Sequence, residues 1–264
     1  MSVRTVTRGT LEYLTADNIG AAHCFTTRLG GVSKGHLASL NLGANRGDAP
    51  GNVEENFRIL SHGLGFEPGN LVLTRQTHSD IVRAVTKGDH LTFNNHDYPE
   101  CDALITSDPG TALMVFSADC TPILFHDPVT GAVGAAHAGW RGTAAAIAGK
   151  TVKAMTAAFG CRPENIRAAI GPNIAQCCFE TDGDVPQAMC DAFGDRVLPY
   201  IRKVGQKYYV NLKEINAMIL RDAGITNIDI STHCTACRND LFWSHRLTGG
   251  KRGSQGAIIV CKEA

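Results

Sequence analysis

The sequence predicts an α/β or α+β fold, a single domain in which central layers of mixed β-sheet are flanked by helices. Three observations support this prediction. Short apolar segments typical of strands fill the middle of the 264-residue chain, helical patterns with recognisable ends follow them, and no repeat, low-complexity tract or linker divides the sequence. We therefore expect one domain over residues 1–264.

The expected elements follow from apolar spacing and from the residues that end each segment. Residues 26–52 form a long loop rich in Gly, Asn, Ser and Asp, which is either a connection or part of a site. Apolar residues spaced for one helix face predict a helix over residues 53–64, with Asn52 as its N-cap. Thr143 is expected to cap another helix, which Gly160 ends. Strands are expected at residues 71–73, 81–85, 103–106, 112–117, 122–125, 133–136, 166–170, 228–232 and 257–261, and further helices at 185–193 and 212–223.

Composition argues against several classes of partner. Lys plus Arg and Asp plus Glu each number 25, so no net charge attracts nucleic acid or an anionic membrane. The longest apolar stretch, residues 111–125, is interrupted by Ser117, Asp119 and Pro122 and is too short to span a bilayer. The first residues lack a secretion signal, so the ten cysteines are expected to be reduced. We expect a cytoplasmic monomer that acts on a small molecule.

His78, Cys120 and His137 are the main candidates for catalysis. They lie in the motifs RQTHSDIV, SADCTPILFHD and AAHAGWRGT, at expected strand ends, where a sheet can bring distant side chains together. Two imidazoles and one thiolate occupy three positions of a zinc tetrahedron and leave the fourth for water or substrate, as in catalytic sites. The same ligands suit copper, so both metals remain open. Taken singly, each residue could instead serve packing.

Two further segments could bind an anion. Residues 138–142 form a glycine-containing turn before an expected helix, where Arg141 could pair with phosphate or carboxylate. A plain strand-to-helix turn with a solvated arginine is equally compatible with this pattern. The tail at residues 241–255 gathers basic side chains, including Arg246, and is either a substrate-facing loop or a solvated hairpin.

The remaining cysteine motifs allow several interpretations. HCTACRND contains His233, Cys234 and Cys237, which could form a second zinc site, a redox pair or, as we prefer, reduced and partly buried thiols. Cys177 and Cys178 are adjacent and therefore poorly suited to one metal, so we expect them in the core.

Several motifs together resemble those of the YfiH family, also called the multicopper polyphenol oxidase or laccase-domain family. They are TTRLGGVSKG, SLNLG, RQTH, CDALIT, ADCTPILFHD, AAHAGWRGT, IGPNI, CCFE, and HCT with FWSHR, and they extend from about residue 25 to residue 260. The resemblance implies a cytosolic α/β domain with a metal site of His78, Cys120 and His137. It also implies an enzyme that splits adenosine, inosine and methylthioadenosine with phosphate and that deaminates adenosine.

One departure from the family lies near the C-terminus. The family often has Gly-Arg followed by Met or Gln, whereas this chain has Gly253, Ser254 and Gln255, with Arg252 displaced by two positions. If the family arginine binds substrate, this change bears on specificity. A lesser departure is Thr181 after CCFE, where an aliphatic residue is usual.

The favoured function is a metal-dependent purine nucleoside phosphorylase, with zinc as cofactor and a purine nucleoside and phosphate as substrates. Adenosine deamination is a side activity, for which Asp102 and Asp119 are candidate acid/base carboxylates. The substrate-binding candidates are Arg28, Asn41, Arg141 and Arg246.

Three other functions are alternatives. A copper polyphenol oxidase is disfavoured because its oxygen-reducing copper cluster needs many histidines, usually as HxH pairs, and this chain has ten histidines but no such pair. The other two are an enzyme that edits peptidoglycan precursors and a non-enzymatic zinc-binding module.

Overall fold

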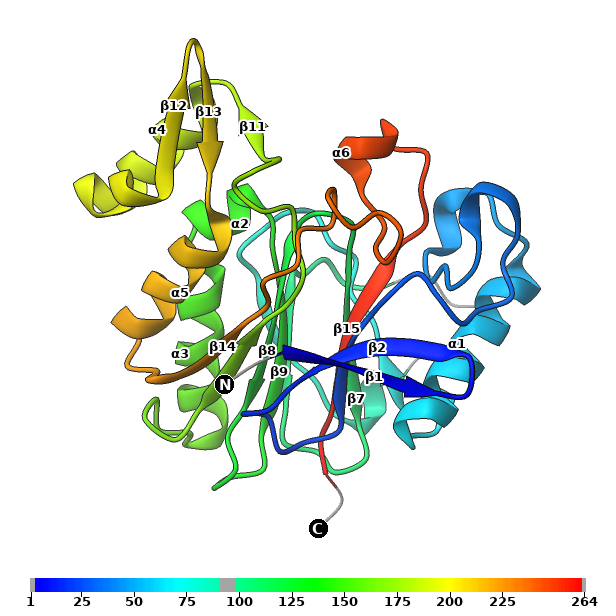
Figure 1. The fold of residues 1–264 in the computed structure, drawn as a ribbon. Helices are drawn as coiled ribbons and strands as arrows, with labels where there is room; N and C mark the ends of the chain where they lie inside the picture. The colour runs from blue at the N-terminus through cyan, green and yellow to red at the C-terminus, as the bar shows by residue number, and fades with distance from the viewer. Residues whose placement is uncertain (1–2, 91–97, 263–264) are drawn as a thin grey trace.

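Two six-stranded sheets lie face to face at the centre of the molecule (Figure 1). The computed structural model describes residues 3–90 and 98–262. The first sheet has the strand order β1-β2-β3-β15-β7-β4, and only β4 runs parallel to its neighbour. Its strands are β1 (Val3–Arg8), β2 (Leu11–Ala16), β3 (His23–Thr26), β15 (Gln255–Val260), β7 (Ala112–Ser117) and β4 (Leu71–Val72).

The second sheet is mixed and has the order β14-β10-β8-β9-β6-β5. The two outer pairs, β14 with β10 and β5 with β6, are parallel, and the inner pairs are antiparallel. Its strands are β14 (Asn227–Ile230), β10 (Arg167–Ile170), β8 (Thr121–His126), β9 (Val133–Ala138), β6 (Ala103–Thr106) and β5 (Val82–Ala84).

A small third sheet, β11-β13-β12, lies beside α4 at the upper left of Figure 1. Its strands are β11 (Glu180–Thr181), β13 (Lys207–Val210) and β12 (Ile201–Val204). The α-helices are α1 (Pro50–Leu64), α2 (Trp140–Ala144), α3 (Ile147–Phe159), α4 (Asp184–Phe193), α5 (Leu212–Asp222) and α6 (His245–Thr248). Short 3-10 helices are η1 (Gly35–Leu37), η2 (Ala44–Arg46), η3 (Pro68–Asn70), η4 (Lys87–Asp89) and η5 (Gly194–Tyr200). Among the described residues, no helix combines the length and the apolar character needed to cross a membrane.

Three apolar clusters join the layers. Phe57 of α1 packs on the outer face of the first sheet, and Phe25 lies between the two sheets. Neighbouring residues of β8 point to opposite sides: Leu124 contacts the first sheet, whereas Ile123 and Phe125 pack toward α3 and α5. The second sheet is therefore buried on both faces, which explains the continuous apolar runs of its strands.

The predicted fold class is confirmed, and most predicted elements are present with shifted ends. α1 begins at Pro50, because proline suits the first helical turn, and Asn52 lies inside the helix, where its side chain donates to Asp48. The helix expected between Thr143 and Gly160 is divided into α2 and α3, because Ala146 has a φ of 58°. The strands that were not predicted are β1, β2, β3, β11, β12 and β13.

Close packing between the two sheets gives a stability prediction. A Cβ atom at Gly171 would overlap the Phe25 ring and approach Pro122 Cγ to 2.9 Å. Because Phe25 is buried, we expect Gly171→Ala to lower the free energy of unfolding by about 1–3 kcal/mol in denaturant titrations. The control is Gly51→Ala, where nothing lies within 4 Å of the added atom. Equal losses in both variants would contradict the packing argument.

Candidate metal centre and substrate cavity

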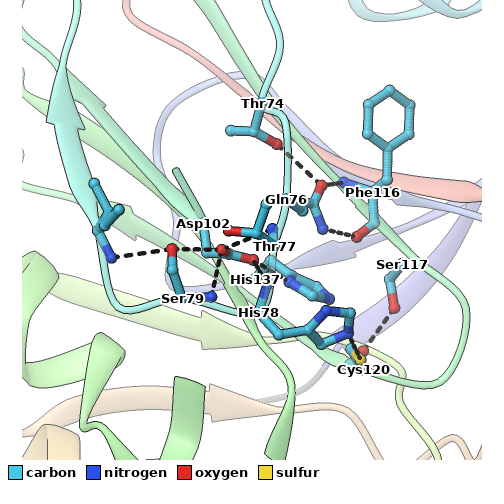
Figure 2. Close-up of polar contacts among 11 residues, drawn as sticks. Thr74, Gln76, Thr77, His78, Ser79, Asp102, Phe116, Ser117, Cys120 and His137 are labelled. Carbon is cyan, nitrogen blue, oxygen red and sulfur yellow. Dashed lines mark hydrogen bonds and ion pairs between the residues drawn. The ribbon is translucent and has the colours of Figure 1, made fainter. Parts of the chain in front are cut away.

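His78, Cys120 and His137 come together where the two sheets meet (Figure 2). His78 lies in the loop between β4 and β5, Cys120 in the turn from β7 to β8, and His137 near the end of β9. One ligand atom from each residue lies within 4.8 Å of the other two, and His78 Nε2 is 3.8 Å from Cys120 Sγ. The two imidazole rings are 5.0 Å apart at an angle of 74°.

This arrangement fits a tetrahedral metal ion. Zinc–sulfur and zinc–nitrogen bonds of about 2.3 and 2.0 Å place the two ligand atoms about 3.5 Å apart at a tetrahedral angle. The observed separation between His78 Nε2 and Cys120 Sγ, 3.8 Å, is close to that value. His137 Nδ1 is bound to Asp102 Oδ1 at 2.8 Å, so the ring presents Nε2 as its ligand atom. Three protein ligands leave one position for water or substrate.

The carboxylate of Asp102 organises the loop that carries His78. Its oxygens accept hydrogen bonds from the backbone N–H groups of Thr77, His78 and Ser79 and from Ser79 Oγ, at 2.7–3.2 Å (Figure 2). The same side chain holds His137 from β9. One buried group therefore fixes two of the three ligands.

The loop that carries His78 and the turn that carries Cys120 each contain a residue with a left-handed backbone conformation. His78 has a φ of 59° and Asp119, next to Cys120, has a φ of 92°. Such a conformation costs roughly 1–3 kcal/mol and persists only where surrounding contacts hold it. Gly139 also makes the site possible, because a Cβ atom there would lie 2.8 Å from His78 Cδ2 and 3.2 Å from Cys120 Sγ.

Electrostatic interactions shift the pKa values of Cys120, His137 and Asp102. Burial alone would raise the pKa of Cys120, but the charge and hydrogen bond of His137 lower it to about 6. Burial would lower the pKa of His137, but Cys120 and Asp102 raise it to about 9. Hydrogen bonds from His137 and Ser79 outweigh burial and lower the pKa of Asp102 to about 2. At neutral pH the thiol is thus ionised and His137 is protonated, so a metal ion that binds here replaces the proton of His137.

A cavity of about 840 Å³ opens beside the three ligands. Its walls include residues 42–46 of the long opening loop, the N-terminal half of α1, residues 73–76, the start of α6, and Arg252 and Ser254 after it. The volume lies within the range of about 300–1,000 Å³ that is usual for small-molecule sites. The opening loop and the tail, for which the sequence left two interpretations, therefore both face the cavity.

The predicted substrate-binding residues occupy different places. Arg246 lines the cavity, and its guanidinium donates to the Cys178 carbonyl at 3.2 Å. Arg28 is outside the lining and stacks 3.8 Å from the Trp243 ring, and Arg141 stacks on Trp140 at 4.2 Å.

Asn41 is also outside the lining. Its side-chain oxygen accepts from the N–H groups of Gly43 and Ser254, and its nitrogen donates to the Gly43 carbonyl and to Asp48. With these contacts, Asn41 joins the opening loop to the tail and positions residues that do face the cavity.

Sequence reasoning did not assign Arg46 and Arg252 to the site, although both line the cavity. Burial and repulsion from Arg46 lower the pKa of Arg252 to about 10. Arg252 Nη1 donates to Gly253 O and Ser254 Oγ, but its Nε has no partner among the described protein atoms. For Arg252, the sign in the sequence was its displacement by two positions from the arginine that the family often has.

The two carboxylates considered for acid/base chemistry both hold the site together. Asp119 Oδ1 accepts from Thr235 Oγ1, and its Oδ2 accepts from Ser244 Oγ and from the Arg246 backbone N–H, at 2.5–3.1 Å. Asp102 is occupied by His137 and its loop, as described above. These contacts assign both carboxylates to positioning.

The expected core location of Cys177 and Cys178 is wrong. Cys177 is exposed and Cys178 half-buried, because both lie in a surface turn before β11. They lie beside Cys234 and Cys237, whereas the His233 ring contacts Ser231 Oγ at 3.2 Å.

Comparison with known proteins identifies the family. Residues 22–262 match the family described as multi-copper polyphenol oxidoreductase laccase. The chain belongs to this family. A relative named purine nucleoside phosphorylase YlmD, from Geobacillus stearothermophilus, is 38% identical over 251 residues, which cover 92% of this chain and 91% of the relative. Purine nucleoside phosphorylase YfiH from Escherichia coli is 36% identical, over 86% of this chain and 88% of its own.

Solved structures from the same family have the same fold. The crystal structure of Bacillus licheniformis hypothetical protein YfiH gives a TM-score of 0.92 at 34% identity and covers 98% of this chain and 99% of its own. The YlmD structure from Geobacillus stearothermophilus gives a TM-score of 0.91 at 36% identity, with the same coverage. Together, the family and the His78, Cys120 and His137 ligand set indicate a metal-binding protein.

The role of Asp102 can be tested through metal affinity. Asp102→Asn removes the negative charge and one acceptor, so His137 and the His78 loop lose their fixed orientation. We expect about 10- to 100-fold weaker metal binding in competition with a chromophoric chelator. The control is Asp229→Asn, which changes a buried carboxylate that accepts from the Asn18 N–H. Equal affinities for the two variants would contradict the assignment.

The ionised state of Cys120 can be tested by alkylation of the metal-free protein. Below its pKa of about 6 the thiol is protonated and slow, and above it the thiolate reacts, so modification is expected to rise with a midpoint near that pH. Peptide mass spectrometry separates Cys120 from Cys101, whose pKa burial raises to about 11 and which serves as an internal control. His137→Ala is expected to move the Cys120 midpoint upward, and an unchanged midpoint would refute the coupling.

Proposed function

We propose that this protein is a zinc-dependent purine nucleoside phosphorylase. It would convert adenosine, inosine or methylthioadenosine and phosphate into the free base and the corresponding ribose 1-phosphate. The observation that carries the proposal is one cavity that combines a His-Cys-His ligand set, apolar walls and four arginines, of which Arg75 is paired with Glu100. The names of the relatives described above agree with it.

The guanidinium groups of Arg46, Arg246 and Arg252 form the proposed phosphate subsite. Guanidinium groups that lie close together repel one another unless an anion is between them, and they bind phosphate through several N–H donors. The Nε of Arg252 is buried and has no partner among the described protein atoms, so this guanidinium has hydrogen-bonding capacity that the protein does not use. Arg246 is placed by its backbone N–H, which donates to Asp119 at 2.7 Å.

The purine and ribose would lie against the apolar walls. Val53 and Phe57 of α1, Leu73 and Phe116 supply much of this surface. Gln76 keeps Phe116 in place through two hydrogen bonds with its backbone, at 2.6 and 2.8 Å. Flat apolar surfaces favour the faces of a purine ring, and stacking of this kind does not distinguish strongly between adenine and hypoxanthine.

In the proposed reaction, a phosphate oxygen forms a bond to the ribose anomeric carbon as the bond to the purine nitrogen breaks. The electron pair of the broken bond passes to the purine, which takes up a proton. The arginines would orient phosphate for attack on the face opposite the leaving base. When bound by His78, Cys120 and His137, zinc would supply Lewis-acid polarisation of a substrate oxygen.

Zinc is proposed over copper on the arrangement of histidines. In the described parts of the chain, the two clusters of three or more metal-ligating side chains are the His-Cys-His set and a group of four cysteines. A cluster rich in histidine, as oxygen reduction by copper requires, is therefore not formed by these residues. Adenosine deamination remains a proposed side activity. Besides Asp119, the cavity wall carries the carboxylate of Glu54 of α1, which pairs with Arg58.

The phosphate subsite can be tested with two arginine variants. Arg252→Ala removes a half-buried cation from the cavity wall and is expected to raise KM for phosphate about 10- to 100-fold, since charged hydrogen bonds contribute about 1.5–3 kcal/mol. Arg141→Ala is the comparison, because Arg141 stacks on Trp140 outside the cavity. Initial rates of hypoxanthine release from inosine give both values. A larger rise in KM for Arg141→Ala would instead place the phosphate subsite at the start of α2.

The reaction class can be tested with His137→Ala and with chelator. Both should abolish base release while circular dichroism stays unchanged, because the metal serves chemistry and the fold has its own core. Base release without phosphate, or undiminished release by His137→Ala, would refute phosphorolysis at this site. Oxygen uptake with a phenol that is lost in the same variant would favour the oxidase, and unfolding on chelation would favour a structural zinc module.

A further inference from the structure

Four cysteines from two distant segments meet outside the cavity lining. Cys177 and Cys178 belong to the turn before β11, and Cys234 and Cys237 follow β14. Their four sulfur atoms all lie within 4.8 Å of one another, and all four are free thiols. A group of this kind has no part in the proposed phosphorolysis.

The sulfur positions match a tetrahedral thiolate site. Four sulfurs at about 2.3 Å from a central zinc ion lie about 3.8 Å from one another. The Sγ of Cys237 is 3.6 Å from that of Cys177 and 3.4 Å from that of Cys178. A small expansion around a central ion would therefore bring these distances to the tetrahedral value.

Adjacent cysteines can share one site here because of the turn that carries them. The N–H groups of Cys178 and Phe179 both donate to the Ala175 carbonyl, at 3.0 and 2.9 Å. This tight turn brings the thiols of Cys177 and Cys178 to the same neighbour, Cys237. In an extended chain, by contrast, successive side chains point in opposite directions and adjacent cysteines would not face one ion.

Backbone N–H groups point toward the Cys234 sulfur. The backbone N–H of Ala175 donates to Cys234 Sγ at 3.3 Å, and the N–H groups of Ala236 and Cys237 also direct hydrogen bonds to this sulfur. Backbone N–H groups aimed at sulfur stabilise its negative charge and are typical of the outer contacts of metal sites.

A buried cation lies close to the four thiols. Lys213 of α5 is 6% exposed, and its ammonium group donates to the carbonyls of Ser231 and His233 at 2.7 and 2.6 Å. It interacts electrostatically with Cys234 and Cys177. Four thiolates around a divalent ion carry two negative charges, which a neighbouring ammonium would partly offset.

We propose that Cys177, Cys178, Cys234 and Cys237 form a second, closed metal site that binds zinc as a tetrathiolate. Binding releases the four thiol protons to solvent and involves no change of oxidation state. The ion would fasten the turn before β11 to the segment after β14. Both segments adjoin the cavity, the first through Ile174 and Phe179 and the second through the bond from Thr235 to Asp119.

The first test uses the intact protein. In the zinc-loaded wild type, Cys177 and Cys237 are expected to resist alkylation although they are exposed, and removal of zinc should raise their alkylation rate about tenfold or more. Peptide mass spectrometry assigns each thiol. Equal rates before and after zinc removal, or a disulfide among the four residues in freshly isolated protein, would overturn the proposal.

The second test counts metal ions in variants. Wild type should hold about two zinc equivalents per chain, and Cys177→Ser/Cys237→Ser should hold about one, with the metal at His78, Cys120 and His137 retained. Both substitutions are at exposed positions, and Cys190→Ser, on α4, is the control that should keep two. A wild type with one equivalent that the double variant retains would overturn the proposal, as would iron in place of zinc.

Cobalt substitution distinguishes this proposal from the proposed function. The thiolate-to-cobalt absorption of the doubly loaded wild type should lose most of its intensity in the double cysteine variant, since four of the five thiolate ligands belong to the second site. Loss confined to a Cys120→Ser variant would contradict the second site. That outcome would leave the centre at His78, Cys120 and His137 intact, so the two proposals fail separately.

Discussion

The hydrogen bonds of the Asp102 carboxylate are the interaction on which the site depends. This buried group receives three backbone N–H groups from the His78 loop and the ring of His137, so it links a loop after the first sheet with a strand of the second. A carboxylate buried without partners would be unstable, and here every contact it makes also positions a ligand. The left-handed backbone at His78 persists because the same bonds hold it.

The opposite side of the site has a similar construction. Asp119 accepts hydrogen bonds from Thr235, from Ser244 and from the Arg246 backbone, and so it attaches the segment after β14 and the tail to the turn that carries Cys120. Two buried carboxylates thus fix two loops, and the cavity lies between the elements they join. His78 and Cys120 lie in loops, beyond the hydrogen bonds of the two sheets. Side-chain contacts of this kind are therefore needed to fix their positions.

How well the sequence predicts each element depends on how its residues are buried. The strands of the second sheet, such as β6 and β8, are buried on both faces, so their apolar runs are plain. β1 was missed because Val3 and Val6 are only half-buried and its other residues are exposed, so it has no alternating apolar pattern. β3 was missed because His23 and Thr26 are polar, and they are buried only because each accepts a backbone hydrogen bond. The three metal ligands share compact motifs, whereas Arg46 and Arg252 reach the cavity only through contacts between distant parts of the chain.

The departure at Ser254 shows how a cation can change position without leaving the cavity. Residues two apart in an extended segment face the same side, and Arg252 Nη1 indeed donates to Ser254 Oγ at 2.9 Å. Both residues line the cavity, so a long side chain from position 252 can supply the charge that the family often has at 254. Gly43 leaves room for Ser254 and Arg46, because a Cβ atom there would lie 2.7 Å from Ser254 Oγ and 2.9 Å from Arg46 Cγ. In the proposed phosphorylase, the exchange would preserve the phosphate subsite and alter its shape, which would bear on the choice of nucleoside and leave the use of phosphate unchanged.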